Sequence, residues 1–549
     1  MPLMSSLYLG VSGLQTSSNA LNTTAHNMSN VDTAGYTRQQ ISQATRTYVN
    51  VSNMMKPDGK MQTGLGVVYA ETRQVRDYFL DRSLRQESGR KEFYSEQTKA
   101  AEQIEDILGE SGAGISFSRS LDNLWVAVEE LDKDPTSLTN QSLFITRCGE
   151  FVENANDVYD SLKEYQQNLN ATVVNYVDSI NKAAARIEEL NQQIVKIEGG
   201  KLENANDLRD ERNALLDKLS SYASIKFTED GVGYVHVQLE GKDLVKGGTV
   251  NKIDIYTDPR TGFDTPFWSN LATYSESYYN GNITKTVDEE SLKGARLFDL
   301  TREIATEYNN DIGSLKGVLL ARGDHFATFA DIDPNDPVAM ADYEDGIAQS
   351  SIMNAEAEFD MLIHNIVSKI NEIFSGKGET PSANPVTIFT ALSTSSTDTT
   401  SKDGAVYPDQ EDLRCGNIHL NQALKATPSL LSLRTAEGEE DKVVTSALKE
   451  AFEEESYTLN PSVTTRVSFN GYYNAMIGQV SNAGSVFKSI EAAQEITVNS
   501  LDNARLQVVG VNSDEELEFM VMFQNAYNAS SRFINVVNSM LGTLIEQMQ

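Results

Sequence analysis

The most regular pattern of apolar positions runs from about residue 137 to 198. Apolar or nearly apolar residues recur there at alternating steps of three and four, which is the a/d signature of a coiled-coil helix. The pattern predicts a rod of about 80 Å, and Gly199 and Gly200 follow it as an expected end. A second helix from near Asn204 would complete an antiparallel hairpin. The seam runs through Ile145, Cys148, Val152, Ala155, Tyr159, Leu162, Gln166, Leu169, Val173, Tyr176, Ile180, Ala183, Ile187, Leu190, Ile194 and Ile197.

Proline divides the rest of the chain unevenly. Three of the 12 prolines precede Pro259, and the other nine run from Pro259 to Pro461. Because proline interrupts helices, we expect helical flanks around an irregular or β-containing middle. Strands are expected between about 225 and 256, where β-branched and aromatic residues alternate with polar ones. Shorter helices are expected around 91–108, 118–131, 354–374 and 472–507.

The first 31 residues form an uncharged segment. They contain no Asp, Glu, Lys or Arg, although the overall charged fraction would give about seven. A heptad seam broken only by Ser18 predicts a helix. Gly10 and Gly13 cost about 1 kcal/mol each inside a helix, so packing must favour it. The seam is Met4, Leu7, Val11, Leu14, Leu21, Ala25 and Met28.

The C-terminal segment mirrors this pattern. From Phe519 onward the charged residues are Arg532 and Glu546. Two adjacent apolar seams make a face wider than one partner helix needs. One seam is Leu517, Met520, Gln524, Tyr527, Ser531, Ile534, Asn538, Leu541, Ile545 and Met548. The other is Phe519, Phe523, Ala526, Ser530, Phe533, Val537, Met540 and Leu544.

Magnitudes indicate how these ends behave alone. Burying about sixteen apolar side chains would contribute about 24–48 kcal/mol, but a lone terminal helix buries only a fraction of that surface. Ordering each residue costs about 1–2 kcal/mol in backbone entropy. We therefore expect both ends to be mobile in the monomer and to order when packed on each other and on neighbouring subunits. The alternative is an ordinary two-helix closure of one domain.

Composition excludes several classes of function. The chain has 549 residues and a net charge of −34, which argues against binding nucleic acid or an anionic membrane surface. Two cysteines, Cys148 and Cys415, cannot form a disulfide scaffold. No stretch has the roughly 18 apolar residues of a membrane span. The start lacks the basic region of a cleaved signal peptide, so export would need another route.

Motifs at both ends resemble known proteins. The segment HNMSNVDTAGYTRQ at 26–39 resembles the N-terminal signature of bacterial flagellar axial proteins, with Ala34 in place of the usual proline. Four further segments resemble the flagellar hook-associated protein 1 family, and together the matches span nearly the whole chain except about 376–412. These segments are NDLRDERNALLDKL at 206–219, GSLKGVL at 313–319, SLDNARLQVVGVNSDEEL at 500–517 and FQNAYNAS at 523–530.

The resemblance implies an extracellular structural protein that forms a homo-oligomeric ring at the junction between flagellar hook and filament. Its implied neighbours are the hook protein and the next hook-associated junction protein. It implies export through the flagellar type III apparatus without a cleaved signal peptide. It also implies an inner tube of paired terminal helices. A cytoplasmic chaperone would hold the C-terminal helix before export, at Phe519, Phe523, Phe533, Val537, Met540 and Leu544.

The expected assembly interface combines the terminal seams with the signature. Gly35 permits the turn that ends the first helix, and Tyr36 can pack its ring while its hydroxyl meets a polar partner. A simple helix–loop transition without subunit contacts is the alternative. Asn27 and Asn30 could bridge to a neighbour or cap locally. The candidate residues are Leu7, Val11, Leu14, Leu21, Met28, Asn27, Asn30, Gly35, Tyr36, Phe519, Phe523, Tyr527, Phe533, Ile534, Val537, Leu541 and Leu544.

We therefore expect a mainly α fold with a smaller β portion. Long antiparallel coiled-coil helices would come from both chain ends, around a β-containing middle and an irregular insertion. Residues 1–60 and 508–549 would form the terminal helical domain, disordered in the monomer. Residues 61–375 and 430–507 would form a helical bundle with a β module near 222–300. Residues 376–429 would be an exposed insertion or a small separate domain.

Catalytic, cofactor and metal sites are not expected. Cys415 and His419 have half the ligands of a metal site, and the calcium-like start at Asp331 has Asp336 where glycine is required. No Walker loop, Gly-x-Ser-x-Gly elbow or HExxH motif is present. An enzyme in the middle region at 225–433 is the alternative from another class, and a hook or filament protein is the nearer one.

Overall fold

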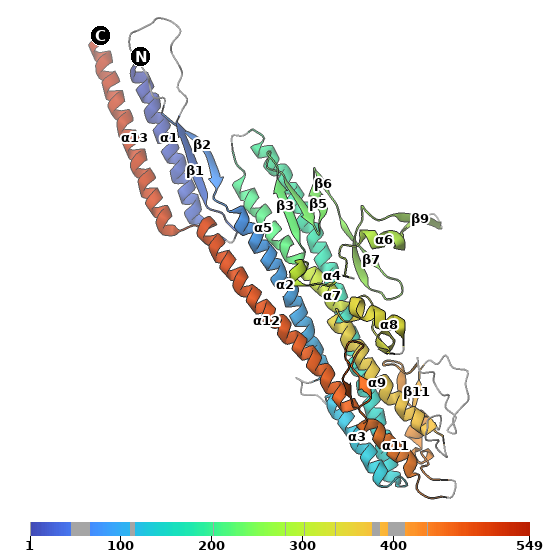
Figure 1. Ribbon diagram of the computed structural model, residues 1–549. Coiled ribbons are helices and arrows are strands. Elements are labelled where there is room, and N and C mark those ends of the chain that lie inside the picture. The colour runs from blue at the N-terminus through green and yellow to red at the C-terminus, as the bar shows by residue number, and fades with distance from the viewer. Residues whose placement is uncertain are drawn as a thin grey trace. The chain divides into compact units, whose positions relative to one another are not determined.

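The computed structural model confirms the predicted fold class, a mainly helical chain with small antiparallel sheets (Figure 1). It describes residues 2–33, 35–45, 66–109, 116–200, 203–279, 282–300, 302–334, 336–375, 385–392, 412–435 and 438–548.

The chain divides into two compact units. Unit 1 comprises residues 1–88, 180–251 and 495–549, and unit 2 comprises 89–179 and 252–494. The division falls inside three helices, α2 (Tyr78–Ile107), α4 (Leu138–Glu198) and α12 (Phe469–Val509). The three-part domain division expected from the sequence stays a prediction.

Unit 1 contains the two terminal helices and two small sheets. The terminal helices are α1 (Pro2–Ser29) and α13 (Ser513–Met548), and α5 (Asn206–Tyr222) packs with the end of α4. A hairpin of β1 (Gln39–Thr45) and β2 (Val67–Gln74) contacts α1. An antiparallel meander consists of β3 (Ile225–Glu229), β4 (Val235–Leu239), β5 (Lys242–Lys246) and β6 (Thr249–Val250).

Unit 2 is built around helices. Its core joins α3 (Phe117–Lys133), α4, α9 (Ser351–Ser375) and α12, because the Phe117 ring contacts the rings of Phe151, Phe359 and Tyr473. The strand pairs are β7 (Ile253–Thr257) with β8 (Asp264–Trp268), β9 (Tyr274–Tyr279) with β10 (Asn282–Val287), β11 (Phe389–Ala391) with β12 (Ile418–Leu420), and β13 (Tyr457–Thr458) with β14 (Arg466–Val467). The shorter helices are α6 (Glu289–Ala295), α7 (Ser314–Arg322), α8 (Pro337–Asp342), α10 (Gln422–Ala426) and α11 (Lys442–Glu453).

The heptad pattern of α4 is the sequence feature that the structure reproduces most closely. Cys148, Leu162 and Ile187 of its seam are fully buried. Gln166 is a polar seam residue, and its amide donates to the backbone carbonyls of Arg322 and His325. The predicted hairpin with α5 is present, and Arg212 of α5 crosses back to Asn191 with a 2.9 Å hydrogen bond.

Other expectations need correction. The helix expected from about 91 begins at Tyr78, and strands continue past residue 256 to Val287. The hairpin β1–β2 was not expected at all. The insertion at 376–429 lies outside the described residues at 376–384 and 393–411. Within its described parts, Ile388, Phe389, Ile418 and Leu424 are buried in unit 2, whereas Leu392 is 72% exposed, and the exposed insertion as a whole stays a prediction.

Candidate assembly interface

The two terminal helices lie against each other through small residues. A Cβ built on Gly10 would lie 2.7 Å from Cγ1 of Ile534, and one built on Gly13 would lie 2.8 Å from Oγ of Ser530. Glycine therefore permits an approach of the two backbones that a larger residue would prevent. This close packing explains why two glycines are tolerated inside α1.

The contacts fix an antiparallel register. Gly10 meets Ile534, Gly13 meets Ser530, and Asn27 reaches Glu516, so the residue numbers rise on one helix as they fall on the other. Figure 1 shows both chain ends at the same end of this pair. Among the α1 side chains whose burial the structure describes, from residue 6 onward, the buried positions are small or polar: Gly10, Thr16, Ser17, Ala20, Thr24 and Asn27.

The apolar seam expected on α1 is therefore not the face that this chain buries. Leu7, Leu14, Leu21 and Met28 are half-buried, and Val11 is 44% exposed. The pairing inside the chain uses the face of small residues. Large apolar side chains remain partly open beside it.

The apolar surface of α13 is likewise only partly covered within the chain. Among its side chains that the structure describes, those of Glu516 and Val537 are buried. Of the expected interface residues, Phe519, Phe523, Ile534 and Leu541 are half-buried, and Tyr527, Phe533, Met540 and Leu544 are exposed. The exposed group also includes Leu517, Val521, Met522, Val536 and Ile545.

Asn27 is held within the chain. Its side chain is 1% exposed. The amide nitrogen donates to the carbonyl of Gln39 at 2.9 Å and to the carboxylate of Glu516 at 3.1 Å. The amide oxygen accepts from the Tyr36 hydroxyl at 2.8 Å and from the Gln39 N–H at 3.0 Å. This geometry joins the end of α1, the start of β1 and the start of α13.

Asn30 and Gly35 have more local surroundings. Asn30 donates to the carbonyl of His26 one turn earlier, and its side-chain oxygen accepts from the Thr33 hydroxyl at 3.2 Å. Gly35 is exposed and has a φ of +80°, the left-handed region that favours glycine. These contacts make Asn30 a local cap of α1 and Gly35 the turn after it.

Tyr36 and Thr37 attach the signature to α5. The ring of Tyr36 meets His26 edge-on, and the Thr37 N–H donates to the Asp210 carboxylate at 3.1 Å. Burial, followed by the nearby charges of Asp207, Asp210 and Glu516, raises the pKa of Tyr36. Its hydroxyl is therefore a neutral donor. Burial also raises the pKa of Asp210.

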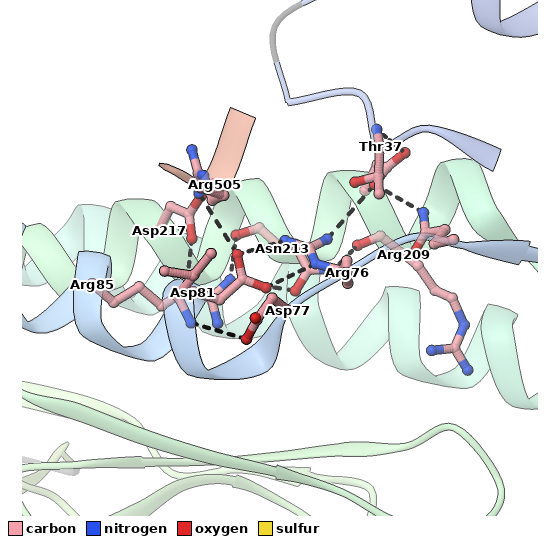
Figure 2. Close-up of polar contacts among 12 residues, drawn as sticks. Thr37, Arg76, Asp77, Asp81, Arg85, Arg209, Asn213, Asp217 and Arg505 are labelled. Atoms are coloured by element: carbon pink, nitrogen blue, oxygen red, sulfur yellow. Dashed lines mark hydrogen bonds and ion pairs between the residues drawn. The ribbon is translucent and has the colours of Figure 1, made fainter. Parts of the chain in front are cut away.

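A chain of ion pairs continues from Asp210 along α5, and Figure 2 shows Arg76, Asp81, Arg85, Asp217 and Arg505 among its members. Arg76 lies 3.7 Å from Asp210 and donates from Nε to Asp81 at 2.9 Å. Asp217 accepts from Arg85 at 2.6 Å and from Arg505 at 2.9 Å. The network ties α2, α5 and α12 together within unit 1. Its charged side chains are buried or half-buried, and each has a partner of opposite charge.

The pairing of Arg38 with Glu515 and Glu516 escaped the sequence analysis. The Arg38 guanidinium donates to Glu516 at 2.8 Å and to Glu515 at 3.0 Å, and Glu516 is 2% exposed. The signal was present in outline, because Arg38 is the first basic residue of the chain and Glu515 and Glu516 are acids in the first turn of α13. Their distance in sequence hid the pairing.

Cys415 and His419, the half of a metal site noted in the sequence, lie in different surroundings. The Cys415 thiol is fully buried, which raises its pKa, and His419 lies 3.1 Å from the Thr390 hydroxyl. In the described part of the chain, no group of three or more His, Cys, Asp or Glu residues is placed to bind a metal. None of the helices described there is both long and apolar enough to cross a membrane.

Known proteins match the chain over almost its full length. Residues 101–324 match the family model of the flagellar hook-associated protein FlgK helical domain, and residues 7–37 match that of the flagella basal body rod protein. Flagellar hook-associated protein 1 of Bacillus subtilis is 25% identical over 99% of each chain. Its counterpart from Escherichia coli is 23% identical over 97% of this chain and 98% of that protein.

A solved structure agrees in fold. The flagellar hook junction protein FlgK from Burkholderia pseudomallei covers 78% of this chain and 100% of its own, with a TM-score of 0.53 and 12% identity. Taken with the matches to the helical domain and to the full-length relatives, this likeness leads to one conclusion. The chain is similar to flagellar hook-associated protein 1 over almost its full length, and its residues 101–324 match the helical domain of that protein.

Proposed function

We propose that this protein is a structural adaptor that forms a ring at the junction between flagellar hook and filament. Copies assemble through α1 and α13, each terminal pair packing against the pairs of its neighbours. The observation that carries the proposal is the distribution of burial on this pair. The chain covers the small face of α1 and leaves large apolar side chains on α1 and α13 open.

The amount of open apolar surface supports several neighbours rather than one. Between residues 513 and 547 of α13, nine large hydrophobic side chains are exposed, and they lie along the helix from Leu517 to Ile545. Monomeric proteins rarely leave such an extended apolar surface in water. Asn, Ser and Gln separate these side chains where a solvated helix would carry charges. A helix inside a polymer has this composition.

The partners follow from the family. Its members are named for association with the hook, so the hook end would supply one neighbour of the ring and the next junction protein the other. The ring would be extracellular, after export without a cleaved signal peptide. A cytoplasmic chaperone would bind the apolar residues of α13 before export, because exposed apolar helices otherwise aggregate. These residues are Phe519, Phe523, Phe533, Val537, Met540 and Leu544.

A deletion strain tests the proposal. Cells without this protein should make hooks of normal length and shed filament subunits into the medium, and the restored gene should return filaments to the hooks. A purified chain should bind isolated hook ends without polymerising alone, whereas a filament protein would grow indefinitely. Normal filaments in the deletion strain, or long polymers of the purified chain, would overturn the proposal.

A further inference from the structure

We propose that Arg38 positions the terminal helix pair by holding the start of α13 against the end of α12. The inference rests on the proposed function and deepens it, because it names residues that direct the assembly surface without touching a neighbour. Asn27 and Glu516 belong to the same device. All the contacts that support it lie within unit 1.

The helical conformation is interrupted between the two C-terminal helices, α12 and α13. α12 ends at Val509, and the Gly510 N–H still bonds the carbonyl of Leu506 at 2.8 Å. A Cβ at Gly510 would collide with that carbonyl oxygen, so the break is built for glycine. Asn512 then begins α13, because its side-chain oxygen accepts from the Asp514 N–H at 3.0 Å.

Arg38 contacts both sides of this break. Its backbone N–H donates to the carbonyl of Val509 at 2.8 Å, which satisfies the last residue of α12. Its guanidinium donates from Nε to Glu516 at 2.8 Å and from Nη1 to Glu515 at 3.0 Å. The planar fork of arginine suits two carboxylates at once, and the group also lies 5.6 Å from the centre of the Phe519 ring.

Glu516 connects this joint to α1. One of its carboxylate oxygens accepts from Arg38, and the other accepts from the side chain of Asn27 at 3.1 Å. The carboxylate also lies in the first turn of α13, where the helix dipole favours negative charge. Glu516 therefore links the start of α13 to the end of α1 directly and to the end of α12 through Arg38. Removing Arg38 would leave this buried carboxylate without its cationic partner.

The burial of Asn27 and Glu516 indicates that they position the helices and do not contact a neighbouring subunit themselves. Asn27 is 1% exposed and Glu516 is 2% exposed, so a neighbouring subunit cannot reach either side chain. Their effect on assembly must pass through the directions of α1 and α13. The open apolar residues of those helices then make the contacts between copies.

Spin labels at two exposed positions measure the joint directly. Cysteines replace Ile496 on α12 and Asn525 on α13, and the native Cys148 and Cys415 are buried and do not take the label. The labelled full-length chain is bound to isolated hooks, and the distance distribution and the affinity are measured together. The variants are R38A, R38K, E516A and the double variant R38A/E516A. Matched controls are R73A on β2 and E518A on α13, both at exposed positions.

The expected result is a broad label distance and at least tenfold weaker hook binding for R38A and E516A. The loss in the double variant should be smaller than the sum of the two single losses, because both single variants break the contact between Arg38 and Glu516. R38K keeps the positive charge but lacks the planar guanidinium group. Its hook affinity and its label-distance width should therefore lie between those of R38A and the wild type. The controls should match the wild type.

Two results would overturn the inference. One is wild-type affinity in R38A. The other is weaker binding with an unchanged label distance, which would make Arg38 a direct contact. Wild-type protein that fails to bind hooks would instead overturn the proposed function. In that case, the distribution of label distances is compared between free wild-type and free R38A chains. Equal widths of the two distributions would reject the inference, and a broader distribution in R38A would support it.

Discussion

At the scale of single residues, Gly10 shows how the terminal pair depends on size. The position faces a branched side chain, because Ile534 Cγ1 and Phe533 Cδ1 would lie 2.7 and 3.1 Å from a Cβ there. Neither atom can move without shifting its ring or its chain. Gly13 differs, since the nearest atom is the end of the Ser530 side chain, which can rotate away.

Substituting valine for Gly10 should therefore separate the two helices. We expect the G10V variant to bind hook ends about tenfold more weakly or worse, which matches an overpacking cost of about 1–3 kcal/mol. G13A is the matched control and should bind nearly as the wild type does, because alanine also favours the helix. Binding of purified protein to isolated hooks measures both. Equal binding of G10V and wild type would show that the helices do not meet at this position.

At the scale of whole elements, the sequence predicted long periodic helices well and short polar elements poorly. α4 was recognisable because its buried seam repeats without a slip over many turns. The β1–β2 hairpin was missed, because its strands are mostly polar and 21 residues separate them, from Arg46 to Gly66. α2 was expected to begin near 91, although Asp77 caps it earlier by accepting from the N–H groups of Phe79 and Leu80.

The terminal helices show a different limit of sequence reasoning. Their existence followed from periodicity, but the face that each presents did not. The seam of large residues looked like the natural contact between α1 and α13. Packing instead favoured the small face of α1, where Gly10, Gly13 and Ala20 let the backbones approach. The pair at Arg38 and Glu516 was invisible because it depends on the fold bringing distant residues together.

The open face of α13 should be dispensable for folding and required for assembly. A triple variant, F533S/M540S/L544S, removes three exposed apolar side chains and leaves the buried Val537 in place. We expect unchanged melting of the bulk of the chain and at least tenfold weaker binding to isolated hooks. Purified protein is used because these residues are also proposed to bind the chaperone. The matched triple Q524S/N528S/N535S changes exposed polar positions of the same helix and should bind normally.

At the scale of the whole molecule, buried acids make the stability depend on pH. α9 carries Glu356, Glu358 and Asp360, all buried in unit 2. Burial raises their pKa values to about 8, 7 and 6 respectively, against partial compensation by hydrogen bonds. Glu358, for example, accepts from the amides of Asn354, Asn460 and Gln479. The folded chain therefore holds protons that the unfolded chain has released.

The sign of the pH effect follows. A raised carboxyl pKa stabilises the fold at low pH, and this stability is lost as pH rises from about 4 towards 8. His325, whose bonds to Asp324 and Asp331 raise its pKa to about 10, acts in the same direction. We expect the free energy of unfolding to fall by at least about 2 kcal/mol between pH 5 and 9, measured by urea titration. E358Q should flatten this dependence, and the exposed E372Q on the same helix should not. An unchanged slope in E358Q would contradict the burial argument.

The last prediction concerns the order of the chain ends before assembly. α13 buries little within one chain, so its helical hydrogen bonds gain little from tertiary packing. In dilute free protein, the amides of α1 and α13 should exchange rapidly, while those of the fully buried part of α9 stay protected. Binding to hooks should slow exchange in both terminal helices by at least tenfold, because neighbours then cover their apolar faces. The helices of unit 2 serve as the internal control, since their burial does not depend on neighbours. Terminal helices as well protected as α9 in the free monomer would mean that one chain alone completes the pair, and the open faces would then need another explanation.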